Sequence, residues 1–120
     1  ADYLLAERLR RRLCERWAEV FATVDAVVGP TAPLTAWPTG QTEVTLGGRV
    51  ESALAASWRF TYPWNLVGAP AVSVPCGFDD RGLPIGLQIA AAPFDDMTAL
   101  RVAAAVEAQM GGPAPKAPLS

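Results

Sequence analysis

Apolar residues in the first part of the chain recur every three or four positions, the spacing that places side chains on one face of an α-helix. This stripe consists of Leu5, Leu9, Leu13, Trp17, Val20 and Phe21. The opposite face is charged, and we interpret it as a solvated surface; its members are Arg8, Arg11, Arg12, Glu15 and Glu19. The pattern predicts an amphipathic helix from Asp2 to about Thr23.

A run of β-branched residues follows this helix and stops at a Gly-Pro pair. The run, Val24–Pro30, predicts a short buried strand. Three prolines and a glycine then exclude regular structure over residues 29–40. Because ligand sites in α/β proteins commonly lie on loops that leave a strand end, this loop is a candidate binding segment.

A Gly-Gly pair in the middle of the chain predicts a tight hairpin. Gly47 and Gly48 separate two alternating segments, residues 42–46 and 49–51, which we expect to form its strands. The next residues, Ala53–Trp58, are compatible with a short helix.

Prolines divide the second half of the chain. Pro63 biases the residue before it away from helical geometry, so we expect an extended or turn segment there. Ala71–Val74 predicts a strand that ends at Pro75, and Ile85–Ala90 predicts a second strand that follows a proline.

Two pairs of aspartates lie where turns or helix starts are expected. Asp79 and Asp80 belong to a polar turn between the two strands, and Asp95 or Asp96 can cap a final helix over Met97–Met110. We interpret both pairs as capping or solvated groups rather than as catalytic carboxylate pairs.

Helices that alternate with two or three short apolar strands predict an α/β fold whose strands are covered on both faces. We expect residues 1–111 to form one unit and residues 112–120, which are rich in proline, to form a flexible tail. Apolar residues make up 51% of the chain and charged residues 18%, a mixture that suggests faces covered by a partner.

Charge and cysteine content exclude several functions. With a net charge of -2 and no basic block beyond the arginines of the first helix, nucleic acid is not expected as a ligand. Cys14 and Cys76 lack metal-ligand spacing, so we interpret them as structural thiols and expect no metal or cofactor. No signal peptide and no membrane span is evident, which predicts a reduced, cytoplasmic setting.

The chain offers few groups for catalysis. It contains no histidine, which excludes triads built on that residue, and its one lysine, Lys116, lies in the predicted tail. Ser73 falls in the middle of a predicted strand without a flanking glycine, so we expect its hydroxyl to be hydrogen-bonded inside the sheet.

The segment Phe60–Ala91 reads FTYPWNLVGAPAVSVPCGFDDRGLPIGLQIAA. It resembles the C-terminal signature "FTxPxNLxGxPAxSVPxGF…GLPxGLQ" of the amidase signature enzymes, Ser-cisSer-Lys hydrolases that cleave carboxamides. Residues 15–33 and 94–109 are similar to the family's helix, strand and "P-T" loop and to its last helix. In that family the catalytic residues belong to an upstream Gly/Ser-rich segment, and nothing in this sequence matches it.

The resemblance implies that the chain is a C-terminal fragment of an amidase. It would supply part of a mixed sheet covered by helices, together with pocket walls, but no catalytic residue, and alone it would be inactive. The implied partners are the remainder of the amidase chain and a small-molecule amide, with an oligomer also possible. The alternatives are a non-catalytic remnant or interaction module, or part of a glutamyl-tRNA amidotransferase A-like subunit.

The resemblance also implies six pocket candidates: Thr31, Trp37, Trp58, Tyr62, Trp64 and Asn65. Their aromatic members either line an apolar acyl or aryl pocket or fill the core, and Asn65 is expected to bond nearby backbone. Members similar to the amidotransferase's A-type chain carry an acid two residues before the Phe of "FTxP", where this chain has Trp58. That difference favours an amidase that acts on less polar amides over a glutamine amidotransferase.

Overall fold

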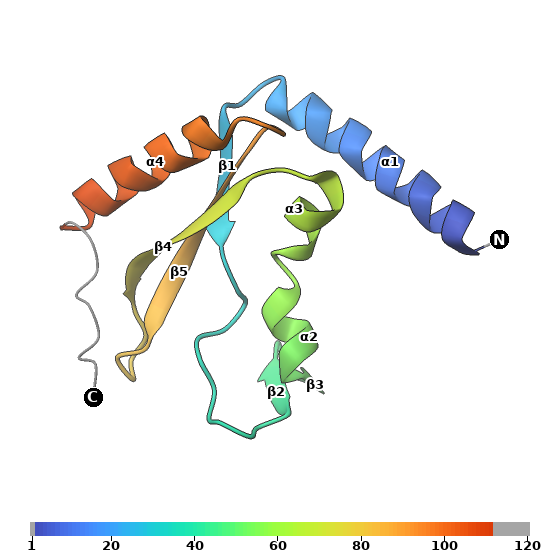
Figure 1. The fold of residues 1–120 in the computed structure, drawn as a ribbon. Helices are drawn as coiled ribbons and strands as arrows, with labels where there is room; N and C mark the ends of the chain where they lie inside the picture. Colours follow the sequence, from blue (N-terminus) through green and yellow to red (C-terminus); the bar gives the residue numbers. More distant parts are fainter. Residues whose placement is uncertain (1, 112–120) are drawn as a thin grey trace.

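The computed structural model describes residues 2–111 and folds them into helices and antiparallel strands (Figure 1). In chain order the elements are α1 (Asp2–Phe21), β1 (Ala26–Pro30), β2 (Glu43–Leu46), β3 (Arg49–Ser52), α2 (Ala53–Trp58), α3 (Tyr62–Val67), β4 (Ala71–Phe78), β5 (Pro84–Ala91) and α4 (Asp96–Gln109). The predicted α/β class is confirmed. The predicted tail and Lys116 lie outside the described residues.

Strand β5 is the centre of a three-stranded sheet with the order β1-β5-β4, and both pairs are antiparallel. Ile89 lies opposite Val28 on one side and Val72 on the other, so these side chains share one face. Helix α4 lies across that face in Figure 1, and its Ala103 packs with Ile89 and Val74. This side of the sheet is an apolar, helix-covered core.

The second face of the sheet is covered in part by α3, with α1 packed on α3. Ala90 of β5 forms a buried cluster with Trp64 and Val67 of α3. The Trp64 ring lies 4.5 Å from the Trp17 ring and 6.5 Å from the Phe21 ring of α1, measured between centroids. Helices therefore contact both faces of the sheet, but the second face is covered only in part, less than the sequence predicts.

The β2–β3 hairpin and α2 form a small unit beside the sheet, which we call the hairpin unit. Gly47 and Gly48 both have positive φ, 54° and 78°, as a two-residue turn between twisted strands requires. The unit has its own buried cluster of Val44, Ala53 and Ala56. The predicted hairpin and the predicted helix over residues 53–58 are confirmed.

Two expectations based on proline were wrong. Tyr62 and Pro63 begin helix α3 rather than an extended segment. The N–H groups of the first helical turn have no acceptor within the helix, so a proline, which has no N–H, loses no hydrogen bond there. Strand β4 does not end at Pro75 but continues to Phe78. In the three-stranded sheet β4 is an edge strand, so Pro75 removes no hydrogen bond to a further strand, and a register shift follows it at Gly77.

The remaining boundaries agree with the sequence to within a few residues. Asp95 caps α4, because its carboxylate accepts a hydrogen bond from the Thr98 amide at 3.2 Å. Within residues 2–111 we find no helix that combines the length and apolar character needed to cross a bilayer.

Candidate functional site

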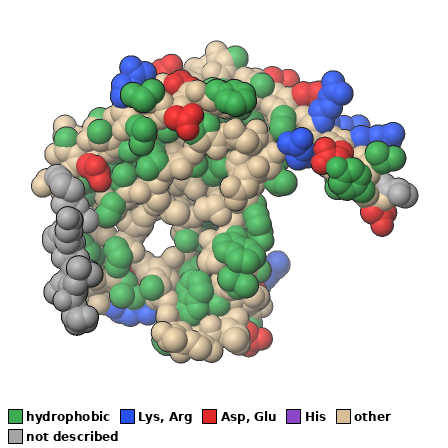
Figure 2. Space-filling view, in the orientation of Figure 1, with side chains coloured by type: hydrophobic (Ala, Val, Ile, Leu, Met, Phe, Trp, Pro, Cys, Tyr) green, Lys and Arg blue, Asp and Glu red, His purple; other side chains and the backbone are tan. Residues whose placement is uncertain are grey.

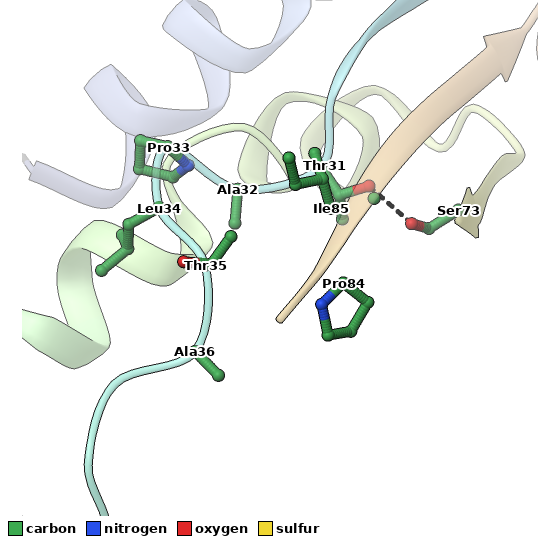
Figure 3. Close-up of a pocket in the computed structure, with 10 residues that line it drawn as sticks. Thr31, Ala32, Pro33, Leu34, Thr35, Ala36, Ser73, Pro84 and Ile85 are labelled. Atoms are coloured by element: carbon green, nitrogen blue, oxygen red, sulfur yellow. Dashed lines mark hydrogen bonds between the residues drawn. The ribbon is translucent and has the colours of Figure 1, made fainter. Parts of the chain in front are cut away.

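An open pocket of about 400 Å³ lies between the loop that follows β1, Ser73 of β4 and the first residues of β5. Figure 3 shows this loop on one side and the two strands on the other, and Figure 2 shows an opening in the molecular surface at the same place. The pocket is lined by Thr31, Ala32, Pro33, Leu34, Thr35, Ala36, Ser73, Pro84, Ile85 and Gly86. None of these side chains is charged, so the pocket suits an uncharged group.

Two hydroxyl groups meet at the inner end of this pocket. Thr31 Oγ1 and Ser73 Oγ are 2.5 Å apart, from opposite sides of β5 (Figure 3). Gly86 of β5 lies beneath them, and a Cβ atom there would be 2.8 Å from each of the two oxygens. The Thr31 amide also donates to the Gly86 carbonyl at 2.9 Å. The missing side chain at Gly86 therefore allows the two hydroxyls to pair across the central strand.

A second pocket of about 260 Å³ shares this hydroxyl pair and extends toward α3. Its polar lining groups are Thr31, Thr61, Asn65, Ser73 and Gln88. Gln88 is almost fully buried, and its Nε2 donates to the Phe60 carbonyl at 3.0 Å. Hydroxyls and amides can both donate and accept, so this face of the sheet can hydrogen-bond a carboxamide without any charge.

The loop is fixed at its far end by a clamp of three side chains, Thr35, Asp79 and Arg81. Asp79 Oδ2 accepts hydrogen bonds from Thr35 Oγ1 at 2.6 Å and from Arg81 Nη2 at 3.0 Å. Arg81 Nη2 also donates to Thr35 Oγ1 and to the Ala36 carbonyl. The pocket loop is thus held at Thr31 by the sheet and at Thr35 by the β4–β5 turn.

The Asp79 carboxylate also organises its own turn, since its Oδ1 accepts from the amides of Arg81 and Leu83 at 2.9 and 2.8 Å. The Thr35 hydroxyl first, and then the Leu83 amide, hold the pKa of the Asp79 carboxyl well below its usual range. A carboxylate stabilised in this way is a weak base. Asp79 therefore fits the turn role expected from the sequence, with the added contact to the pocket loop.

The structure brings three of the six pocket candidates to one place. Thr31, Asn65 and Trp64 all line the second pocket. Trp64 is 8% exposed, and its buried Nε1 has no hydrogen-bond partner among the described residues. A buried indole N–H without a partner is uncommon, and this one is enclosed in the core between α1, α3 and β5.

The other three candidates lie elsewhere. Trp37 packs against the buried cluster of the hairpin unit. Trp58 and Tyr62 are about half exposed and contact each other edge to face, with ring centroids 5.9 Å apart. The aromatic candidates thus divide between core packing at Trp37 and Trp64 and an exposed pair at Trp58 and Tyr62.

Three residues of the site were not predicted as such from the sequence. Gly86 and Gln88 were not among the candidates, and Ser73 was expected inside the sheet. Ser73 is hydrogen-bonded as expected, but it is exposed on the open part of the sheet face rather than enclosed in the sheet. A signal was present, because Ser73 lies opposite Gln88 in the register and Gly86 lies two residues before Gln88 on the same face. Within residues 2–111, no cluster of His, Cys, Asp or Glu has the composition of a metal site.

The amidase family profile matches residues 1–100, which include α1, the pocket loop and both strands of the site. This match covers most of the chain. The chain therefore belongs to the amidase family.

Individual relatives agree with this assignment. The chain is 43% identical to a fatty acid amide hydrolase of Medicago truncatula over 92% of its own length and 18% of the relative's. It is 42% identical to the A-type chain of the glutamyl-tRNA(Gln) amidotransferase of Myxococcus xanthus, over 89% and 21% respectively. A solved amidase structure superimposes with a TM-score of 0.83 at 31% identity, over 90% of this chain and 25% of that one. The chain thus spans about a fifth to a quarter of the proteins it matches.

Proposed function

We propose that this chain forms one wall of the substrate pocket in an enzyme that hydrolyses a carboxamide C–N bond. The nucleophilic serine, its cis-bonded serine and the lysine would come from a part of the protein outside this chain. The observation that carries the proposal is the uncharged hydroxyl pair of Thr31 and Ser73, on the open sheet face of a chain that belongs to the amidase family.

The chemistry of the site supports a binding role rather than proton transfer. The two pockets that meet at the hydroxyl pair contain hydroxyls, amides and apolar side chains. Asp79 is hydrogen-bonded to the pocket residue Thr35 and has a lowered pKa, so this carboxylate is a poor acceptor for the proton of a nucleophile. The chain would orient the amide while groups elsewhere perform the acyl transfer.

For the substrate, we propose an amide of low polarity. Identity does not separate the two kinds of relative, since it is 43% to the fatty acid amide hydrolase and 42% to the amidotransferase chain. The exposed Trp58–Tyr62 pair offers apolar area where amidotransferase-like members of the family carry an acid. A cytoplasmic setting is also proposed, supported by the two unpaired cysteines, Cys14 and Cys76.

The first test is an assay of the 120-residue chain against a panel of primary amides, aryl amides and glutamine. We expect no release of ammonia or amine above the buffer rate. Turnover that disappears on Ser73→Ala would show that the chain has its own nucleophile and would refute the proposed division of roles.

The second test is the coding sequence upstream of Ala1. An in-frame Gly/Ser-rich segment with adjacent serines and an earlier lysine is the expected result. In the longer protein, Ser73→Ala and Thr31→Val should raise KM for an apolar amide several-fold and leave kcat nearly unchanged. A loss confined to kcat would place the hydroxyl pair in the chemical step instead.

A further inference from the structure

The N-terminal end of α1 is apolar on several sides and is not covered by the rest of the molecule. Tyr3, Leu4 and Leu5 are 75%, 62% and 56% exposed. Consecutive residues of an α-helix point about 100° apart, so these three side chains face three different directions. A flat surface can cover only one or two of them, whereas a socket that surrounds the helix end can cover all three.

The same helix shows what a covered segment looks like. From Leu13 onward its apolar face packs against α3, with Trp17 and Phe21 in ring contact with Trp64. Every residue from 2 to 12 is exposed, and Arg10 reaches α3 only through a hydrogen bond from Nη1 to the Leu66 carbonyl at 3.2 Å. In Figures 1 and 2 this part of α1 extends away from the sheet as an arm.

We propose that the end of this arm, residues 3–5, seats in an apolar socket on the larger complementary part of an amidase fold. This inference rests on the proposed function for the identity of the partner. The family match includes the arm. In the matched relatives, the part outside the matched region is about four times as long as the matched region itself. An amphipathic helix normally buries its apolar side chains against another element, and none of the described residues covers Tyr3, Leu4 and Leu5.

A second copy of this chain is a poorer occupant. If residues 3–5 of two copies packed against each other, the arginines that follow them in each copy would come close together. These are Arg8, Arg10, Arg11 and Arg12. Only Arg10 and Arg11 have an acidic partner within the helix, Glu7 and Glu15 respectively. Repulsion between these arginine groups would oppose such a dimer.

The test is reconstitution in two pieces. The Medicago truncatula fatty acid amide hydrolase, with the segment that this chain matches deleted, is tagged and co-expressed with the chain, and the same is done with the truncated Myxococcus xanthus amidotransferase chain. We expect a 1:1 complex with at least one of them. The double variant Tyr3→Asp/Leu5→Asp should weaken it about a hundredfold, as the loss of two anchoring side chains predicts.

The matched control is Arg8→Asp/Arg12→Asp, which places two aspartates on the charged face of the same helix and should change the affinity less than about threefold. Circular dichroism of each variant checks that α1 remains helical. The proposal is overturned if neither truncated relative forms a complex, if both double variants weaken it equally, or if the chain alone forms a dimer that Tyr3→Asp/Leu5→Asp dissociates. Hydrolysis is not the readout here, so the two proposals fail separately: loss of the complex overturns the docking of the arm, whereas the proposed function is overturned by the kinetics of Ser73→Ala and Thr31→Val in the longer protein.

Discussion

The two faces of strand β5 differ although their residues alternate along one strand. Ile89 points to the α4 side, where it is completely buried with Val74 and Ala103. Its neighbour Gln88 points to the other side, where hydroxyls, a glycine and open pockets surround it. One face stabilises the fold, whereas the other is only partly covered by a helix and retains polar groups that can contact a ligand.

The largest expected effect compares these two neighbours directly. Ile89→Ala removes a fully buried side chain and should lower the free energy of unfolding by about 3–4 kcal/mol. Gln88→Ala removes one hydrogen bond to the Phe60 carbonyl and should cost about 1–2 kcal/mol. Urea unfolding followed by tryptophan fluorescence measures both. Equal losses would contradict the division of the sheet into a stabilising face and an open one.

The next effect comes from the narrow space above Gly86. Gly86→Ala places a Cβ 2.8 Å from both hydroxyl oxygens and 3.2 Å from Thr31 Cβ, so the pair must separate at a cost of about 1–2 kcal/mol. Gly29→Ala is the matched control, because Gly29 lies opposite Gln88 on the same face and a Cβ added there would meet no atom within 4 Å. It should change stability by less than about 0.5 kcal/mol. If the two alanines cost the same, crowding at the hydroxyl pair is not the cause.

The clamp on the pocket loop should show a characteristic pH dependence. Because the pKa of Asp79 is lowered in the folded chain, its contribution to stability is complete above the unfolded value of about 3.9 and declines as the pH falls below it. Asp79→Asn should therefore lower the urea midpoint equally at pH 7 and pH 5, and the difference from wild type should shrink below about pH 4. Asp80→Asn, which removes the neighbouring carboxylate, is the control and should leave the midpoint nearly unchanged. A difference that grows in acid would give the opposite sign and reject the clamp.

The smallest effect tests how far α4 covers its face of the sheet, the face on which Ile89 is buried. Val28 shares a face with Ile89 across the register but is 57% exposed. Val28→Thr should therefore change the free energy of unfolding by less than about 0.5 kcal/mol in thermal or urea unfolding. A cost above about 1 kcal/mol would mean that the helix-covered core, which includes Ala26 of β1, extends along that strand to Val28.

Much of the fold could be predicted from the sequence because local rules and tertiary packing agree. The helical stripe, the Gly47-Gly48 turn and the Asp95 cap each depend on neighbouring residues. The errors at Pro63 and Pro75 have one origin: the effect of a proline depends on whether its position needs an N–H donor, and a first helical turn and an edge strand do not. That requirement is set by the tertiary structure.

The site was predictable in part. Thr31, Trp64 and Asn65 do line one pocket, but Ser73 and Gln88 belong to it only because β4 and β5 pair in one particular register. The same limit applies to Asp79, whose partner Thr35 lies 44 positions away along the chain. Sequence spacing places residues on a face, and strand pairing decides which residues of other strands join them.

The separate core of the hairpin unit has a consequence for how related chains can diverge. Its buried cluster of Val44, Ala53 and Ala56 packs with Leu34, a residue that also lines the pocket next to Thr35. Substitutions inside that cluster can reshape this rim of the pocket while the strand register of the sheet stays as it is. Selection can therefore change which molecules fit against the sheet without having to rebuild the sheet.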